Sequence, residues 1–208
     1  MQTTALWHID SSNSELQTVT LPSPKKEEII IKSLYSLVST GTERLVSSGG
    51  VPTSLHQSMK VQGMAGTFNF PVKYGYSVVG KVVSNGELAG KLVHLMYPHQ
   101  NQIIVSPTLV SEIPTAVTPK IASLASNMET ALNAIWDSGV SVGDRVMICG
   151  FGMIGALVAR LLSFLPAVEV FILEKNPNRL AVAKKMGFQT VEVSSNNCLL
   201  YTSPSPRD

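Results

Sequence analysis

The stretch VMICGFGMIGALVARLLSFLPAVEVFILE, residues 146–174, decides the fold of this 208-residue chain. A short apolar run leads into GFGMIG at residues 150–155, and a second apolar run ends at Glu174. Between the two runs, apolar residues recur at helical spacing, as in a helix that packs on a sheet. The order strand, glycine-rich turn, helix and strand predicts a βαβ unit with parallel strands.

The glycine-rich turn matches G-x-G-x-x-G, the pattern that binds the pyrophosphate of a dinucleotide. In this pattern the first glycine permits the tight turn, the second lets the pyrophosphate approach the backbone, and the third lets the helix pack closely. The helix N-terminus adds unpaired N–H groups and the positive end of a dipole. The alternative is a turn whose glycines serve packing alone. We expect a cofactor-binding segment at six consecutive residues: Gly150, Phe151, Gly152, Met153, Ile154 and Gly155.

Glu174 lies about 20 residues beyond the turn, where dinucleotide-binding units carry an acidic residue. Its carboxylate can accept hydrogen bonds from ribose hydroxyls and would repel a 2′-phosphate, which favours NAD over NADP. Lys175 and Arg179 favour the opposite choice, because a cation there could hold a 2′-phosphate.

Two regions with different patterns flank residue 118. Before it, strands are expected at residues 28–38, 76–83, 91–96 and 102–105, with Gly80 marking a bulge or a close backbone approach. After it, helices at 121–136, 153–165 and 177–186 alternate with strands at 145–150, 168–173 and 189–193. Asn176 followed by Pro177 predicts the start of the last helix, and Gly187 its end. The chain is therefore predicted to be α/β, with a β-rich domain at 1–118 and a parallel α/β domain at 119–197.

Composition excludes several classes of function. The formal net charge is +2 and basic residues do not cluster with aromatic ones, which argues against a nucleic-acid partner. No apolar run reaches the roughly 18 residues that span a membrane, and the N-terminus lacks a secretory signal. The two cysteines, Cys149 and Cys198, predict no disulfide framework. We expect a cytoplasmic protein with a small-molecule substrate.

Four strings resemble the medium-chain dehydrogenase/reductase superfamily, and within it the bacteriochlorophyllide a dehydrogenases and their uncharacterised relatives. They are STGTE at 39–43, FPVKYGY at 70–76, MYPHQ at 96–100 and ETALNA at 129–134. The resemblance covers about residues 25–197. It implies an N-terminal GroES-like β-barrel domain followed by a truncated Rossmann domain. It also implies NAD-dependent oxidation of a secondary alcohol to a ketone, contact of Thr130 with the nicotinamide, and a homodimer of the full-length parent.

Zinc-containing members of that superfamily hold a catalytic zinc with a Cys, the His of a Gly-His-Glu motif and a second Cys. The corresponding positions here fall near Thr40 or Gly41, at residues 75–77 (GYS), and near Ser126. None of these is a good zinc ligand, so we expect no catalytic zinc. A histidine site would need His94 and His99 to find further partners.

Without zinc, another group must handle the alcohol proton. The resemblance makes Tyr76, which occupies a ligand position, the leading candidate, since a phenol can relay a proton or bind the developing oxyanion. Glu43, Thr42 and His99 are further catalytic candidates. Each has a structural alternative. Tyr76 can be a packing tyrosine and Glu43 a carboxylate at a helix start or turn. Thr42 can be a local cap and His99 a solvated loop histidine. Lys73 is interpreted as a solvated loop cation.

The end of the sequence departs from a complete dinucleotide domain, which needs about six strands. After Glu174 only one helix and one strand are predicted, and residues 198–208, CLLYTSPSPRD, resemble a translated sequencing adapter. A short natural Ser/Pro-rich tail is the alternative. We expect the chain as given to be an inactive fragment of an enzyme. Two other functions stay open: a zinc-independent quinone or enone reductase, and a non-catalytic NAD-binding protein.

Overall fold

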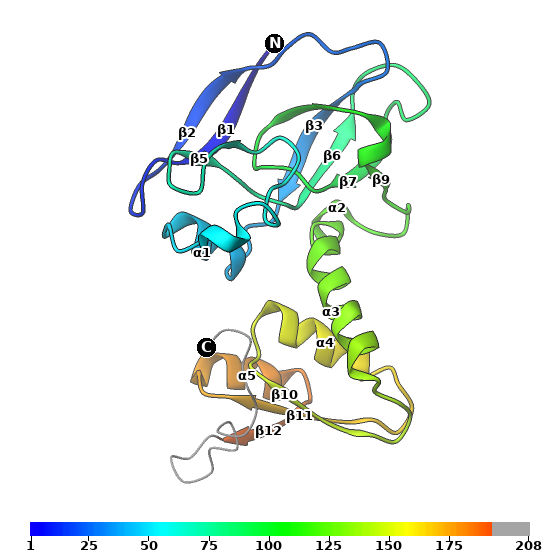
Figure 1. Ribbon diagram of the computed structural model, residues 1–208. Coiled ribbons are helices and arrows are strands. Elements are labelled where there is room, and N and C mark those ends of the chain that lie inside the picture. Colours follow the sequence, from blue (N-terminus) through cyan, green and yellow to red (C-terminus); the bar gives the residue numbers. More distant parts are fainter. Residues whose placement is uncertain (193–208) are drawn as a thin grey trace. The chain divides into compact units, whose positions relative to one another are not determined.

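The computed structural model describes residues 1–192 and divides the chain into two compact units, Met1–Ser126 and Asn127–Asp208 (Figure 1). The division falls later than the boundary expected after residue 118. The reason is that Ala122 packs with Val79 and Ile113 in a small core cluster of the first unit. The predicted tail at 198–208 and the end of the last predicted strand lie outside the described residues.

The first unit consists of two antiparallel sheets, with the strand orders β2-β1-β5-β4 and β8-β3-β6-β7-β9. Among the described residues these sheets stay open and do not close into one hydrogen-bonded barrel. The strands are β1 (Gln2–His8), β2 (Ser14–Thr20), β3 (Ile29–Ser36), β4 (Ala65–Gly66), β5 (Val72–Lys73), β6 (Val78–Val82), β7 (Leu92–Leu95), β8 (Gln102–Val105) and β9 (Ser111–Glu112). The β1–β2 hairpin was not predicted from the sequence.

Apolar residues that alternate along β7 and β8 build the core of the five-stranded sheet. Ile31, Val78, Val93 and Ile103 are fully buried in it. The close approach predicted at Gly80 is confirmed, because a Cβ there would lie 2.4 Å from Cγ2 of Ile31. The register of β3 against β6 shifts beside this glycine.

The helices of this unit are short: α1 (Thr42–Ser47) and α2 (Pro119–Ala122). The helix predicted over 121–136 is divided, since α2 ends at Ala122 and α3 (Ala125–Ser138) starts afresh. The Thr118 hydroxyl caps α2 by accepting a hydrogen bond from Ile121 N–H, and Pro119 occupies the first helical position. These start signals move the beginning of the helical region upstream of the prediction.

The second unit contains the predicted βαβ rhythm. Its elements are β10 (Arg145–Cys149), α4 (Met153–Leu162), β11 (Glu169–Glu174), α5 (Pro177–Lys185) and β12 (Gln189–Glu192), and its strands form a parallel sheet in the order β10-β11-β12 (Figure 1). Asn176 caps α5 by accepting from the N–H groups of Asn178 and Arg179, and Gly187 follows the helix with a φ of 85°. Both helix signals are thus confirmed. Within residues 1–192, no helix is long and apolar enough to cross a membrane.

The glycine turn depends on close contact between backbone atoms. Gly150 has a φ of 99°, which favours glycine. A Cβ on Gly155 would lie 2.1 Å from the carbonyl oxygen of Gly150, whereas a Cβ on Gly152 would meet no atom within 4 Å. Gly155 is therefore required for packing, and the space beside Gly152 is open.

These two glycines give a matched test. Gly155→Ala should destabilise the parallel sheet by about 1–3 kcal/mol, the usual cost of overpacking. Gly152→Ala should change stability by no more than about 0.5 kcal/mol, as expected where no atom is displaced. Hydrogen exchange of the β10 and β11 amides measures both. Equal destabilisation by the two variants would contradict this account of the turn.

Candidate functional site

The turn between β10 and α4 presents free backbone donors at a helix N-terminus. Gly150 N–H donates to the carbonyl oxygen of Leu173 (2.7 Å), which fixes the turn to β11. No side chain caps α4, whose N-cap residue is Gly152. The first N–H groups of an uncapped helix are available to an anion and lie at the positive end of its dipole.

Glu174 holds this turn from the end of β11. Its Oε2 accepts from Phe151 N–H (2.8 Å), and its Oε1 accepts from the N–H groups of Lys175 (2.9 Å) and Asn176 (2.8 Å). The carboxylate, in a residue that is only 6% exposed, thus links the glycine turn to the turn that starts α5. Arg179 lies nearby, with a guanidinium nitrogen 3.6 Å from Oε2.

These contacts set the charge state of Glu174. Burial raises the pKa of its carboxyl, but the hydrogen bonds from Asn176, Phe151 and Lys175, together with the charge of Arg179, bring the pKa below its ordinary value. An ionised carboxylate has about four lone-pair positions, and three of them receive backbone N–H groups here. One position remains for a ribose hydroxyl.

Phe151 differs from the other five residues of the predicted segment. Its N–H already donates to Glu174, and its side chain is buried, with the ring centroid 5.9 Å from that of Phe188. Phe151 therefore anchors the turn in the core. The donors left for a phosphate come from Gly152, Met153 and Ile154.

Replacing Glu174 by Gln should lower the stability of the second unit by about 1–3 kcal/mol at neutral pH, because the amide NH₂ would face backbone donors. Because folding lowers the pKa of Glu174, its carboxylate contributes more to stability at high pH than at low pH. The contribution of the carboxylate is complete above the unfolded pKa of about 4.3 and is lost as the pH falls through the folded value. Hydrogen exchange of β11 amides from pH 7 downward tests this. Identical pH profiles for the two proteins would contradict it.

Glu43 and His99, two of the predicted catalytic residues, form a buried pair in the first unit. Nε2 of His99 lies 2.5 Å from Oε2 of Glu43, and Oε1 of Glu43 accepts from Ser39 N–H (2.8 Å). His99 fits closely against Gly75, because a Cβ on Gly75 would lie 2.8 Å from Nε2 of the imidazole. His99 is therefore a buried partner of a carboxylate, and the alternative of a solvated loop histidine is wrong.

The pKa of Tyr74 indicates which groups lie near the Glu43–His99 pair. Burial, and then the charges of Glu43 and Tyr76, raise the pKa of Tyr74 to about 12. Glu43 and Tyr76 thus act on the same phenol. Tyr76 is half-buried and packs against the apolar cluster that contains Val46 and Val72. Its position is therefore also consistent with the alternative of a packing tyrosine. Thr42 is the half-buried first residue of α1, next to Glu43.

Two buried polar residues of this unit were missed or misread from the sequence. The interpretation of Lys73 as solvated is wrong: it is 6% exposed, and its Nζ donates to Oε1 of Gln100 (2.8 Å). Burial lowers the pKa of the Lys73 amine. His8 is also buried, and its Nδ1 lies 2.8 Å from Oγ of Ser14. The available signals were a lysine between Val72 and Tyr74 and a histidine at the end of an apolar strand.

Ser126, which the family resemblance places near a zinc-ligand position, lies beside His94 together with Ser77. Oγ of Ser77 lies 3.1 Å and Oγ of Ser126 lies 3.3 Å from Nε2 of His94, and Ser126 also donates to the carbonyl oxygen of Tyr76 (3.1 Å). Hydroxyls are poor zinc ligands. Across residues 1–192, no group of three His, Cys, Asp or Glu side chains is arranged to hold a metal ion.

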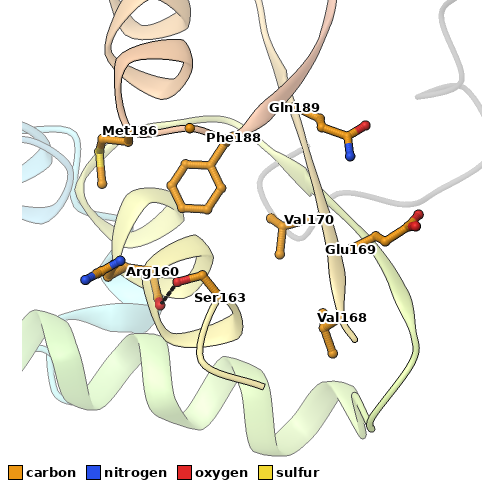
Figure 2. A pocket seen from close by; sticks show the side chains of 9 residues that line it. Arg160, Ser163, Val168, Glu169, Val170, Met186, Phe188 and Gln189 are labelled. Carbon is orange, nitrogen blue, oxygen red and sulfur yellow. Dashed lines mark hydrogen bonds between the residues drawn. The ribbon is translucent and has the colours of Figure 1, made fainter. Parts of the chain in front are cut away.

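The last predicted site residue, Thr130, is exposed on α3 in the second unit. That unit also contains a pocket of about 290 Å³, which lies at the start of β11 and thus at the end away from Glu174. Figure 2 shows Phe188 and Val170 beside it, while Arg160 and Glu169 extend away on opposite sides. Ligands of parallel α/β sheets bind at the carboxyl ends of strands, so the glycine turn is the better candidate.

No family model matches this chain. Its curated relatives are dehydrogenases. The chain is 27% identical over 124 residues to the glutathione-independent formaldehyde dehydrogenase of Bacillus subtilis, which is 59% of this chain and 30% of that protein. It is 34% identical over 87 residues to the L-threonine 3-dehydrogenase of Alteromonas mediterranea, which is 41% of this chain and 25% of that protein. The chain thus matches less than a third of these relatives' length.

Solved structures share the fold. The 2R,3R-butanediol dehydrogenase of Bacillus subtilis superposes with a TM-score of 0.75 at 20% identity, covering 96% of this chain and 65% of that one. An Escherichia coli alcohol dehydrogenase complexed with NADH gives 0.74 at 16% identity, with 93% and 63% covered. The Thermus thermophilus quinone oxidoreductase, studied with NADPH, gives 0.68 at 16% identity, with 91% and 59% covered. The predicted fold class, an α/β chain with a GroES-like domain followed by a Rossmann domain, is confirmed, but the described strands of the first unit do not close into the predicted barrel.

Proposed function

We propose that this chain is part of an NAD-dependent oxidoreductase whose full-length form oxidises a secondary alcohol to a ketone by hydride transfer, without a catalytic zinc. The observation that carries the proposal is the uncapped N-terminus of α4 beside the ionised Glu174, at the carboxyl ends of β10 and β11. This arrangement suits a dinucleotide, with the pyrophosphate on the N–H groups of residues 152–154 and the adenosine ribose on Glu174. The nicotinamide would supply the hydride acceptor.

The preference for NAD rests on how Glu174 is held. Three backbone N–H groups fix its carboxylate in the ionised form, so a 2′-phosphate would meet a buried negative charge. Arg179 is directed to that same carboxylate and is partly neutralised by it. A preference for NADP would require Arg179 to leave Glu174.

The alcohol proton is assigned to the first unit. In the proposal, Tyr76 hydrogen-bonds the alcohol oxygen and the Glu43–His99 pair receives the proton. Thr42 contributes a hydroxyl beside Glu43, and Thr130 contacts the nicotinamide. Tyr76 and Ser126 support chemistry without zinc, because the family resemblance places them where zinc-containing relatives carry a histidine and a cysteine. We further propose a small-molecule substrate, a cytoplasmic location and, for the full-length parent, a homodimer.

The first alternative is a zinc-independent quinone or enone reductase. The likeness in fold to a quinone oxidoreductase favours it, and a preference for NADPH over NADH would support it further. The second alternative is a non-catalytic NAD-binding protein, which would bind the cofactor but exchange hydride with no carbonyl compound.

Cofactor binding tests whether the uncapped N-terminus of α4 beside Glu174 is a dinucleotide site. NAD and ADP-ribose should bind the chain, and Gly152→Ala should weaken both by about tenfold or more, equivalent to about 1.4 kcal/mol, because its methyl group lies where the pyrophosphate must approach. Calorimetric titration measures both affinities. Since Gly152→Ala leaves the fold unstrained, unchanged affinity in this variant would contradict the proposed site.

Turnover tests the chemistry. In the full-length parent enzyme, assayed with a panel of secondary alcohols by NADH absorbance, Tyr76→Phe should lower kcat by about 100-fold, the lower range of what a positioned proton-transfer group contributes. Tyr35→Phe, at an exposed tyrosine, is the control and should have no effect. Equal activity of Tyr76→Phe and the unaltered protein would exclude Tyr76 from the reaction.

A further inference from the structure

Two buried imidazole nitrogens of the first unit have no hydrogen-bond partner, Nδ1 of His99 and Nε2 of His8. The other ring nitrogen of each residue is engaged: Nε2 of His99 by Glu43, and Nδ1 of His8 by Ser14. The two residues are 6% and 7% exposed. Buried polar atoms without partners are rare and costly, so a pair of them in one region calls for an explanation.

The backbone brings these two histidines to the same part of the first unit. The carbonyl oxygen of His99 accepts from Leu6 N–H (2.9 Å), and His99 N–H donates to the carbonyl oxygen of Tyr74 (3.3 Å). His8 lies two residues beyond Leu6 on β1 and pairs with Val72, two residues before Tyr74. Two residues along a strand span about 7 Å, so His8 lies about that distance along β1 from Leu6, and its partner Val72 lies about that distance from Tyr74.

Electrostatics agrees with this placement. Burial lowers the pKa of His8, the charge of Glu43 raises it, and that of His99 lowers it. His8 therefore shares its surroundings with both members of the buried pair. Ser14, at the outer end, is exposed on β2.

We propose that His99 and His8 form a proton relay from the Glu43 carboxylate to the protein surface at Ser14. The link between the two histidines runs from Nδ1 of His99 to Nε2 of His8 through one water molecule. The relay deepens the proposed oxidoreductase function and rests on it, because oxidation of an alcohol releases a proton that must leave the interior.

The relay conserves protons at each step. Glu43 takes the alcohol proton and passes it to Nε2 of His99, while His99 releases the proton on Nδ1 toward Nε2 of His8. His8 in turn releases its Nδ1 proton to the Ser14 hydroxyl, which passes one to solvent. An imidazole suits this task because its two nitrogens exchange donor and acceptor roles. One proton enters at Glu43 and one leaves at Ser14.

The test measures how fast the ring N–H proton of His99 exchanges with solvent, by NMR of the chain labelled with ¹⁵N-histidine. His8→Phe keeps an aromatic ring but removes both nitrogens, and Ser14→Val covers the outer end with methyl groups at an exposed position of a strand. Each should slow the exchange by about tenfold or more, because the proton then leaves only through local opening of the structure. His56→Phe, at a histidine outside the relay, is the control and should leave the rate unchanged.

Unchanged exchange in Ser14→Val, or in a folded His8→Phe, would overturn the relay. An equal slowing in His56→Phe would also overturn it, because it would show a general change in stability. If His8→Phe does not fold, Ser14→Val decides alone. The exchange experiment uses no substrate or cofactor, so a negative result would overturn the relay and leave the proposed oxidoreductase function standing. A negative result in the turnover experiment would overturn the oxidoreductase function and leave the measured exchange pathway standing.

Discussion

The carboxylate of Glu174 connects the two turns on which the dinucleotide site depends. It accepts N–H groups from Phe151 on the glycine turn and from Lys175 and Asn176 before α5. Hydrogen bonds to a buried ionised group are stronger than those between neutral groups, so this one side chain fixes the edge of the sheet where a cofactor would bind. With Phe151 N–H occupied, the N-terminus of α4 is left as the open anion site. The same carboxylate is the group that would face the ribose, so cofactor preference and fold depend on one residue.

The first unit uses buried charge differently. Glu43 pairs with His99 inside the protein, and Lys73 has a carboxamide rather than a carboxylate as its partner. Burying such groups costs stability unless they are well paired, so their presence is more consistent with chemistry than with packing alone. The hydroxyls of Ser77 and Ser126 lie around His94. These observations support proton chemistry by side chains in this unit.

Local sequence signals identified the second unit well. The glycine turn, the cap at Asn176 and the end at Gly187 each depend on residues within a few positions of one another. The first unit was harder to predict, because its important contacts are long-range: Glu43 meets His99 across 56 positions, and Lys73 meets Gln100 across 27. Sequence periodicity gives no information on such pairs. For the same reason the burial of Lys73 and the part played by His8 could not be predicted, although Glu43, Tyr76 and His99 were named individually through the family resemblance.

In the proposed function, the N-terminus of α4 binds the pyrophosphate of the cofactor. Backbone amide NMR of the chain, titrated with ADP, tests this claim directly, because the second unit offers two separate places for a ligand. We expect the largest shifts at the amides of Gly152, Met153 and Ile154. Shifts confined to Val170, Phe188 and their neighbours, which line the pocket at the start of β11, would contradict it.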